Sequence, residues 1–267
     1  MNDVLVALSL TLVAGLSTGI GSLIALFSKR TNTKFLAFSM GLSAGVMIFV
    51  SMVELYADAN RLLSLTYGAK MGAAYTALSF FGGMGLIALI DKLLPAEDNP
   101  HELKFVEDMS EDNTIHKKSL MRTGVFTAIA IAVHNFPEGM ATFVSAMQNP
   151  QIAFPIVAAI AIHNIPEGIA VSVPVFYATG SRWKAFKLSF LSGLSEPLGA
   201  LIGYLVLLPF MSDTMYAVLF AGIAGIMVFI SVDELLPSAR EYGEHHLSIY
   251  GMVLGMIIMA ISLILFI

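Results

Sequence analysis

The sequence predicts an all-α polytopic membrane protein. Of its 267 residues, 57% are hydrophobic and only 12% are charged, whereas soluble chains carry about 25% charged residues. The apolar residues also gather in long runs, each near the ~20 residues with which a helix crosses a hydrocarbon core of about 30 Å. Because backbone polar groups in lipid must be satisfied within the protein, helices are the expected structure of these runs.

Eight such runs define the expected transmembrane helices, in chain order 4–28, 35–57, 71–90, 121–148, 152–178, 186–208, 213–234 and 247–267. We therefore expect one transmembrane domain over residues 1–267. The long connection at residues 96–119 contains seven acidic residues and three lysines. It is expected to be a solvated cytoplasmic loop.

The distribution of lysine and arginine predicts the orientation, because short loops rich in these residues stay on the cytoplasmic side. With the N-terminus outside, only Arg61 and Lys70 of the 14 basic residues fall outside. The other basic residues fall on the inner side: Lys29, Arg30, Lys34, Lys92, Lys104, Lys117, Lys118, Arg122, Arg182, Lys184, Lys187 and Arg240. This asymmetry predicts that both termini lie outside and that the number of spans is even.

Composition also excludes several kinds of partner. The chain has no cysteine, which removes disulfides and thiolate metal ligands. Its net charge of −5 and the position of its basic residues at helix ends give no reason to expect a nucleic-acid partner. The expected surroundings are the lipid bilayer, and the sequence leaves a homodimer open.

An internal repeat relates the two ends of the chain. AGVMIFVSMVEL at 44–55 matches AGIMVFISVDEL at 224–235, with seven of twelve positions identical and an offset of 180. GLSTGIGSLI at 15–24 matches GLSEPLGALI at 193–202 more weakly, at an offset of 178. Repeated helices five spans apart run in opposite directions. The pattern therefore predicts an inverted repeat in a 3+2+3 arrangement, which is typical of secondary transporters.

Two similar polar stretches interrupt the central apolar runs: HNFPEGMA at 134–141 and HNIPEGIA at 163–170. The histidine and the glutamate of each stretch are four residues apart and share one helix face. Each proline removes a backbone N–H, which frees a carbonyl oxygen one turn earlier. The alternative is that these groups hydrogen-bond one another, with the glutamates protonated.

Further polar residues lie at similar depth. Glu196 falls near the centre of the sixth run, and ionisable groups at that depth cost at least ~2.5–3.5 kcal/mol each. The sequence places no lysine or arginine there as a partner, so a divalent cation is the expected one. Met47 is a candidate soft ligand, although in a chain with sixteen methionines core packing is the simpler explanation. Glu54, Asp233 and Glu234 are either vestibule ligands or interfacial acids.

HNFPEG and HNIPEG in consecutive spans resemble the paired signature of the ZIP (Zrt/Irt-like) divalent metal transporters, in particular their bacterial zinc-uptake branch. The resemblance extends over the whole chain, including GLSEPLG in the sixth run. It implies a multi-pass protein of the bacterial cytoplasmic (inner) membrane. It also implies uptake of Zn²⁺, with Fe²⁺, Mn²⁺, Co²⁺ and Cd²⁺ as further substrates and no cofactor.

The resemblance further implies a binuclear metal site on the transport path. One metal position would use His134, Glu138, His163 and Glu167, with Met47 as an added ligand. The second would use Asn135, Glu138, Asn164, Glu167 and Glu196. Not all features fit, because the 96–119 loop lacks the histidine-rich character of many relatives. An intramembrane zinc-dependent hydrolase is the alternative function, but the chain has no His-Glu-x-x-His helix.

Overall fold

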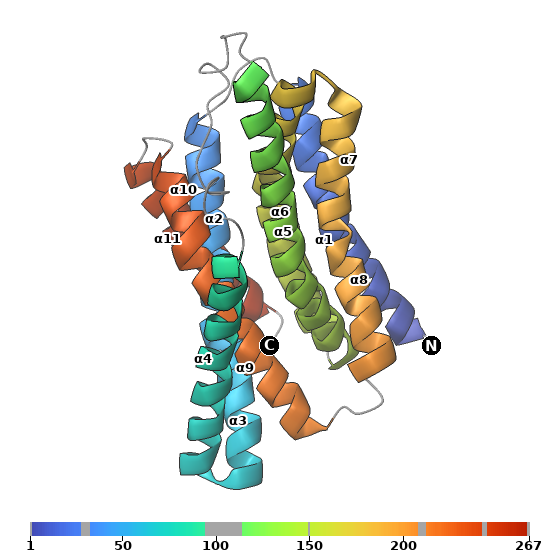
Figure 1. The fold of residues 1–267 in the computed structure, drawn as a ribbon. Coiled ribbons are helices and arrows are strands. Elements are labelled where there is room, and N and C mark those ends of the chain that lie inside the picture. The colour runs from blue at the N-terminus through green and yellow to red at the C-terminus, as the bar shows by residue number, and fades with distance from the viewer. Residues whose placement is uncertain are drawn as a thin grey trace.

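The computed structural model describes residues 2–27, 33–93, 114–148, 150–207, 212–241 and 245–265, and these residues are almost entirely helical (Figure 1). The first half comprises α1 (Asn2–Phe27), α2 (Thr33–Val50), η1 (Ser51–Leu55), α3 (Tyr56–Tyr67), α4 (Ala69–Leu93) and α5 (Thr114–Gln148). The second half comprises α6 (Pro150–Thr179), α7 (Arg182–Gly193), α8 (Ser195–Ile202), η3 (Gly203–Leu207), α9 (Asp213–Ile230), η5 (Ser231–Leu235), α10 (Leu236–Glu241) and α11 (His245–Leu265).

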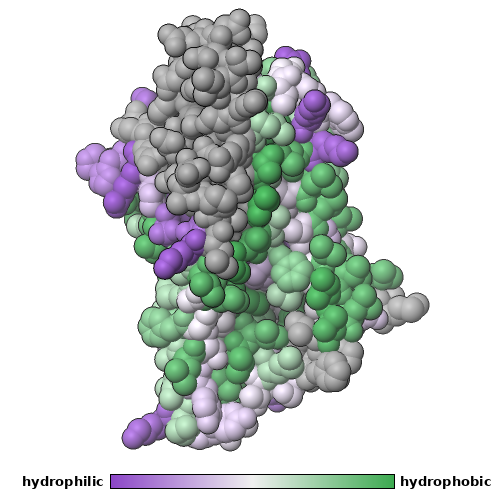
Figure 2. Space-filling model, in the orientation of Figure 1, coloured by the Kyte–Doolittle hydropathy of each residue, from purple (hydrophilic) through white to green (hydrophobic). Residues whose placement is uncertain are grey.

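This helical structure confirms the predicted class of an all-α membrane protein. Within the described residues, six stretches are long and apolar enough to cross a membrane: Asp3–Phe27, Thr33–Tyr67, Ala69–Lys92, Arg182–Val206, Asp213–Leu235 and His245–Ile264. Figure 2 shows apolar side chains over the right-hand and central parts of the visible face, with hydrophilic residues at the upper right, along the left edge and at the lower left tip. An apolar outer surface of this kind fits a lipid environment.

Some boundaries differ from those expected. The helix predicted at 35–57 continues through η1 and α3 to Tyr67. α5 begins at Thr114, inside the span 96–119 that was expected to be a loop, while residues 96–113 lie outside the described residues. Hydropathy marks only the part of a helix that lies in lipid, so polar turns that continue a helix beyond the membrane escape it.

The helices form two groups (Figure 1). We call α1, α5, α6, α7 and α8 the α1 group, and α2, α3, α4, α9, α10 and α11 the α2 group. Inside the α1 group, α1 packs on α6 and α5 packs on α8; inside the α2 group, α2 packs on α11 and α4 packs on α9. The two groups meet where α2 and α11 contact α6 and where α9 contacts α5.

Glycines let helices inside each group approach backbone to backbone. A Cβ atom at Gly168 of α6 would lie 1.9 Å from the Thr18 carbonyl oxygen of α1. A Cβ atom at Gly139 of α5 would lie 2.0 Å from the Glu196 carbonyl oxygen of α8. Helices this close have no room for any side chain at the contact, as in other membrane bundles whose interfaces use small residues. These contacts fix the backbones that carry the polar stretches.

Candidate metal site

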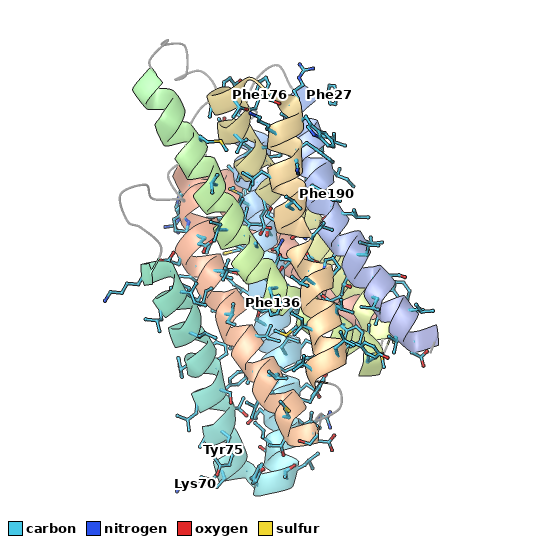
Figure 3. All side chains as sticks on the ribbon, turned by 45° about the vertical axis from the view of Figure 1, so that its right-hand side comes forward. Phe27, Lys70, Tyr75, Phe136, Phe176 and Phe190 are labelled. Atoms are coloured by element: carbon cyan, nitrogen blue, oxygen red, sulfur yellow. The ribbon has the colours of Figure 1, made fainter. Side chains whose placement is uncertain are left out.

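The two HNxPEG stretches lie inside continuous helices, since α5 runs through Pro137 and α6 runs through the equivalent Pro166. Neither proline has an N–H to donate, so the carbonyl oxygens of Val133 and Ile162 lose their usual helical partner. Figure 3 places Phe136 about midway between Phe27 and Phe176 at one end of the molecule and Lys70 and Tyr75 at the other. The first stretch thus lies near the middle of the bundle.

A break between α7 and α8 positions the third carboxylate. α7 ends at Gly193, and Leu194 has φ −67° and ψ −10° before α8 starts at Ser195. Glu196 lies in the first turn of α8, where the positive end of the helix dipole favours a negative charge. Pro197 is tolerated in this first turn, because the N–H groups there lack helical acceptors. The GLSEPLG sequence therefore delivers a carboxylate to the interior at a helix start.

The described members of the predicted site are deeply buried. Asn135, Asn164 and Glu196 are 0% exposed, and Glu138 and Glu167 are 1% and 4% exposed. The carboxyl groups of Glu138 and Glu167 both lie close enough to the Glu196 carboxyl group to interact with it electrostatically. Among the described residues, these three glutamates are the buried charged side chains, and no lysine or arginine is buried.

The Asn164 side chain has a fixed orientation. Its Nδ2 donates a hydrogen bond to the carbonyl oxygen of Ala14 in α1 at 3.0 Å and another, short one to Glu196 Oε1. With the NH₂ group committed to two acceptors, the amide is assigned unambiguously. Its Oδ1 and the Glu196 Oε2 have no hydrogen-bond partner among the described residues. The two hydrogen-bonded side chains therefore each keep one oxygen that could coordinate a cation.

Met47 of α2 is also buried, at 1% exposure. Ser43, one turn earlier, places its Oγ 4.0 Å from the Met47 sulfur. Met47 comes from the other helix group, so a ligand role would require that it reach across the boundary between the groups. It also packs in the main hydrophobic core, which keeps both readings of this residue open.

The two histidines lie in α5 and α6, but the side chains of His134 and His163 are outside what the structure describes. Among the described side chains, no three or more His, Cys, Asp or Glu residues are grouped so that they could hold a metal. The structure thus brings Asn164 and Glu196 into contact and Glu138 and Glu167 near them. The complete ligand set stays a prediction.

Sequence reasoning missed two residues near the site. Ala14 contributes only a backbone oxygen, and no residue pattern announces such an acceptor 150 positions away. Thr18, also on α1, is fully buried with an Oγ1 that finds no partner within the described part of the chain. Its signal was present in the sequence, because the weak repeat at an offset of 178 aligns Thr18 with Glu196.

Comparison with known proteins decides the family. The sequence model of the family described as "ZIP Zinc transporter" matches residues 91–263, more than half of the chain. The chain belongs to the ZIP family. This confirms the resemblance drawn from HNFPEG and HNIPEG.

Several bacterial ZIP proteins, each named "Zinc transporter ZupT", are similar along nearly their whole length. The Clostridium perfringens (strain 13 / Type A) protein is 57% identical, with 100% of this chain and 98% of that protein covered. The Streptococcus mutans serotype c protein is 60% identical, covering 98% and 97%. The Lysinibacillus sphaericus (strain C3-41) protein is 59% identical, covering 98% of each chain. ZIP proteins are transporters, so membership gives the hydrolase alternative no support.

Proposed function

We propose that this protein imports Zn²⁺ into the cytoplasm through the buried polar site between α5, α6 and α8. The observation that carries the proposal is the burial of three glutamates, one of them held by Asn164, in the described interior of an apolar molecule. A divalent cation would compensate that charge. The relatives named zinc transporters support zinc as the main substrate. We extend the proposal to Fe²⁺, Mn²⁺, Co²⁺ and Cd²⁺, which oxygen and imidazole ligands also bind.

The proposed ligands are those predicted from the sequence: His134, Asn135, Glu138, His163, Asn164, Glu167 and Glu196, with Met47 added from α2. The held amide of Asn164 supports an oxygen-rich position beside Glu196. Imidazole nitrogens from His134 and His163 would make the other position the better one for zinc. Glu138 and Glu167 would bridge the two positions.

We further propose that eight helices span the membrane in a 3+2+3 arrangement with inverted repeats. α5 and α6, with 35 and 30 residues, would be spans four and five. Equivalent contacts in the two halves support the symmetry. Gly139 packs on Glu196 as Gly168 packs on Thr18, a match at the repeat offset of 178. Ser17 donates to the Ala14 carbonyl as Ser195 donates to the Ser192 carbonyl, at the same offset.

The α2 and α9 helices support the same symmetry. Both continue into a five-residue π-helix, at Ser51–Leu55 and Ser231–Leu235, which are equivalent positions at the offset of 180. Short π-helical segments are rare and are often found at functional sites. Two of them at equivalent positions are hard to reconcile with unrelated helices.

The proposed orientation places both termini outside in the bacterial cytoplasmic membrane. Arg61 lies in α3 and Lys70 at the start of α4, next to the α3–α4 turn. Lys34, Lys92 and Arg182 lie at other helix ends, which would face the cytoplasm. With this orientation, a cation entering past the α3–α4 end and leaving past the other end is imported.

The central test is zinc uptake into proteoliposomes by wild-type protein, Glu138→Ala and Glu167→Ala. We expect the zinc uptake rate of each variant to fall by about tenfold or more, because each substitution removes a ligand shared by both metal positions. Asp213→Ala is the matched control, since Asp213 is an exposed carboxylate in the first turn of α9. Unchanged uptake in both glutamate variants would refute the proposed site.

A further inference from the structure

The two asparagines of the HNxPEG stretches have unequal surroundings. Asn164 makes two side-chain hydrogen bonds, to Ala14 and to Glu196. Asn135, its equivalent in α5, is also 0% exposed, yet neither its Nδ2 nor its Oδ1 finds a hydrogen-bond partner among the described residues. A buried polar atom left in this way costs about 1–3 kcal/mol. Such a group in a native protein calls for an ordered water or an ion.

The inverted repeat identifies what should face Asn135. The repeat exchanges α5 with α6 and α1 with α8, and at the offset of 178 it aligns Thr18 with Glu196. The backbone contacts follow this exchange, because Gly139 meets the Glu196 carbonyl and Gly168 meets the Thr18 carbonyl. Glu196 reaches from its place beside α5 across to Asn164 in α6. By the same exchange, the counterpart of this contact would join Thr18, beside α6, to Asn135 in α5.

The orientation of Thr18 agrees with this counterpart. A Cβ atom on Gly193 would lie 2.9 Å from Thr18 Oγ1, so the hydroxyl faces the end of α7. That end includes Ser192, whose carbonyl is the repeat equivalent of the Ala14 carbonyl that Asn164 bonds. Thr18 Oγ1 itself is 0% exposed and has no partner in the described part of the chain. Thr18 Oγ1 and both polar atoms of the Asn135 amide thus lack hydrogen-bond partners within the described residues. By the repeat, these two side chains correspond to Glu196 and Asn164, which do bond each other.

Side-chain length explains why the second pair does not close. The glutamate oxygen lies two bonds further from the backbone than the threonine oxygen. Thr18 would therefore end short of Asn135, whereas Glu196 reaches Asn164. A gap there would be edged by the Thr18 hydroxyl and the Asn135 Nδ2. Together with the bound cation, these groups would give a buried water the two to four polar partners that it needs.

We propose that Thr18 and Asn135 hold one ordered water molecule, and that this water is an oxygen ligand of the transported divalent cation. The inference rests on the proposed transport function. The site is then asymmetric by construction: one half supplies a carboxylate from Glu196, and the other supplies a water held by Thr18. Retaining one water favours harder ions such as Mn²⁺, which prefer oxygen, over softer ions such as Cd²⁺. Thr18 is thereby a specificity-determining residue that touches the metal only through the water.

The test compares Thr18→Val, which removes the hydroxyl at nearly constant shape, with Thr18→Ser, which keeps it. Uptake of Zn²⁺ into proteoliposomes is measured with Mn²⁺ and Cd²⁺ as competitors. We expect Thr18→Val to raise the KM for Zn²⁺ about tenfold and to weaken competition by Mn²⁺ more than competition by Cd²⁺. Thr18→Ser should restore both values. Thr11→Val is the control, because Thr11 is an equally buried threonine two turns earlier on α1 whose hydroxyl is bonded to the Leu8 carbonyl.

A high-resolution structure of the zinc-loaded wild-type protein provides a second, independent measurement. We expect density for one water between Thr18 and Asn135, and its loss in Thr18→Val. Wild-type KM and ion preference in Thr18→Val, or no such density in the wild type, would overturn the inference. Absence of zinc uptake by the wild-type protein would instead refute the proposed function. The density between Thr18 and Asn135 would then still decide whether the water is bound.

Discussion

At the scale of single residues, the hydrogen bonds of Asn164 connect three helices, since Ala14 belongs to α1, Asn164 to α6 and Glu196 to α8. A carboxylate and an amide buried at 0% exposure are stable only while they satisfy each other. The same contact that presents oxygens to a metal therefore also holds the α1 group together.

We predict strong coupling between Asn164 and Glu196 in a double-mutant cycle. Asn164→Leu alone leaves the Glu196 carboxylate without its Asn164 donor, and Glu196→Leu alone leaves the amide without one of its two acceptors. Each should lower stability by about 1–3 kcal/mol. The double variant should cost less than the sum, because no polar group is then left unsatisfied.

The measurement is the apparent thermal unfolding midpoint of each purified variant in detergent, without metal. A Ser9→Ala variant is the control, because the Ser9 hydroxyl is on the exposed face of α1 and bonds only its own helix. Additive losses in the double variant would mean that the contact contributes nothing to stability beyond the separate residues.

Much of this site could be predicted from its residues. Ionisable groups within apolar runs indicate a functional site, because burying them in a membrane costs free energy. The helical period also places the His, Asn and Glu of each stretch on neighbouring faces. The Ala14 carbonyl could not be predicted, because a backbone oxygen has no residue signature. Thr18 could be found only through a weak repeat, where its alignment with Glu196 looks like a mere mismatch.

At the scale of elements, the repeat predicted which helices match but not their internal geometry. The π-turns η1 and η5 follow α2 and α9 at equivalent positions, each beginning at a fully buried serine. Ser231 Oγ donates to the Met227 carbonyl at 2.7 Å, a bond that competes with the regular ladder of the helix. Hydropathy is blind to such local widening, because it leaves the apolar pattern unchanged.

We predict that close helix packing at the site is intolerant of a single methyl group. Gly139→Ala would place a Cβ atom 2.0 Å from the Glu196 carbonyl, so α5 and α8 must separate and carry Glu196 with them. We expect a loss of about 1–3 kcal/mol in stability, together with a large loss of zinc uptake. Uptake and the thermal unfolding midpoint are measured on the same preparation.

Gly82→Ala in α4 is the control, because a Cβ atom there meets nothing within 4 Å. Alanine is favoured over glycine in a helix by about 1 kcal/mol, so this variant should be as stable as the wild type or more so. Equal behaviour of Gly139→Ala and Gly82→Ala would show that the α5–α8 contact does not constrain the site.

At the scale of the whole molecule, the closest glycine contacts lie inside the two helix groups. Gly41 and Gly45 of α2 meet the backbone of α11, and Gly21 of α1 meets the backbone of α6. The surface between the groups includes an apolar pocket at the α5–α9 contact, lined by Met140, Val144, Tyr216, Leu219, Phe220 and Ile223. Backbone contacts within the groups, with side-chain contacts between them, are what two bodies need if one moves against the other.

Alternating access by such movement makes a prediction about cross-links. The chain has no native cysteine, so any introduced pair is the only target for a thiol reagent. Cysteines at Met140 of α5 and Leu219 of α9 face the same pocket from different groups. A short bis-methanethiosulfonate linker between them should abolish zinc uptake in proteoliposomes, and dithiothreitol should restore it.

The matched control pair is Tyr67 and Thr214, whose hydroxyls lie 3.3 Å apart on α3 and α9 within the α2 group. Linking that pair should leave uptake unchanged, because it joins helices that move together. Full uptake with the α5–α9 linker in place would mean that zinc crosses without relative movement of the two groups, as in a channel.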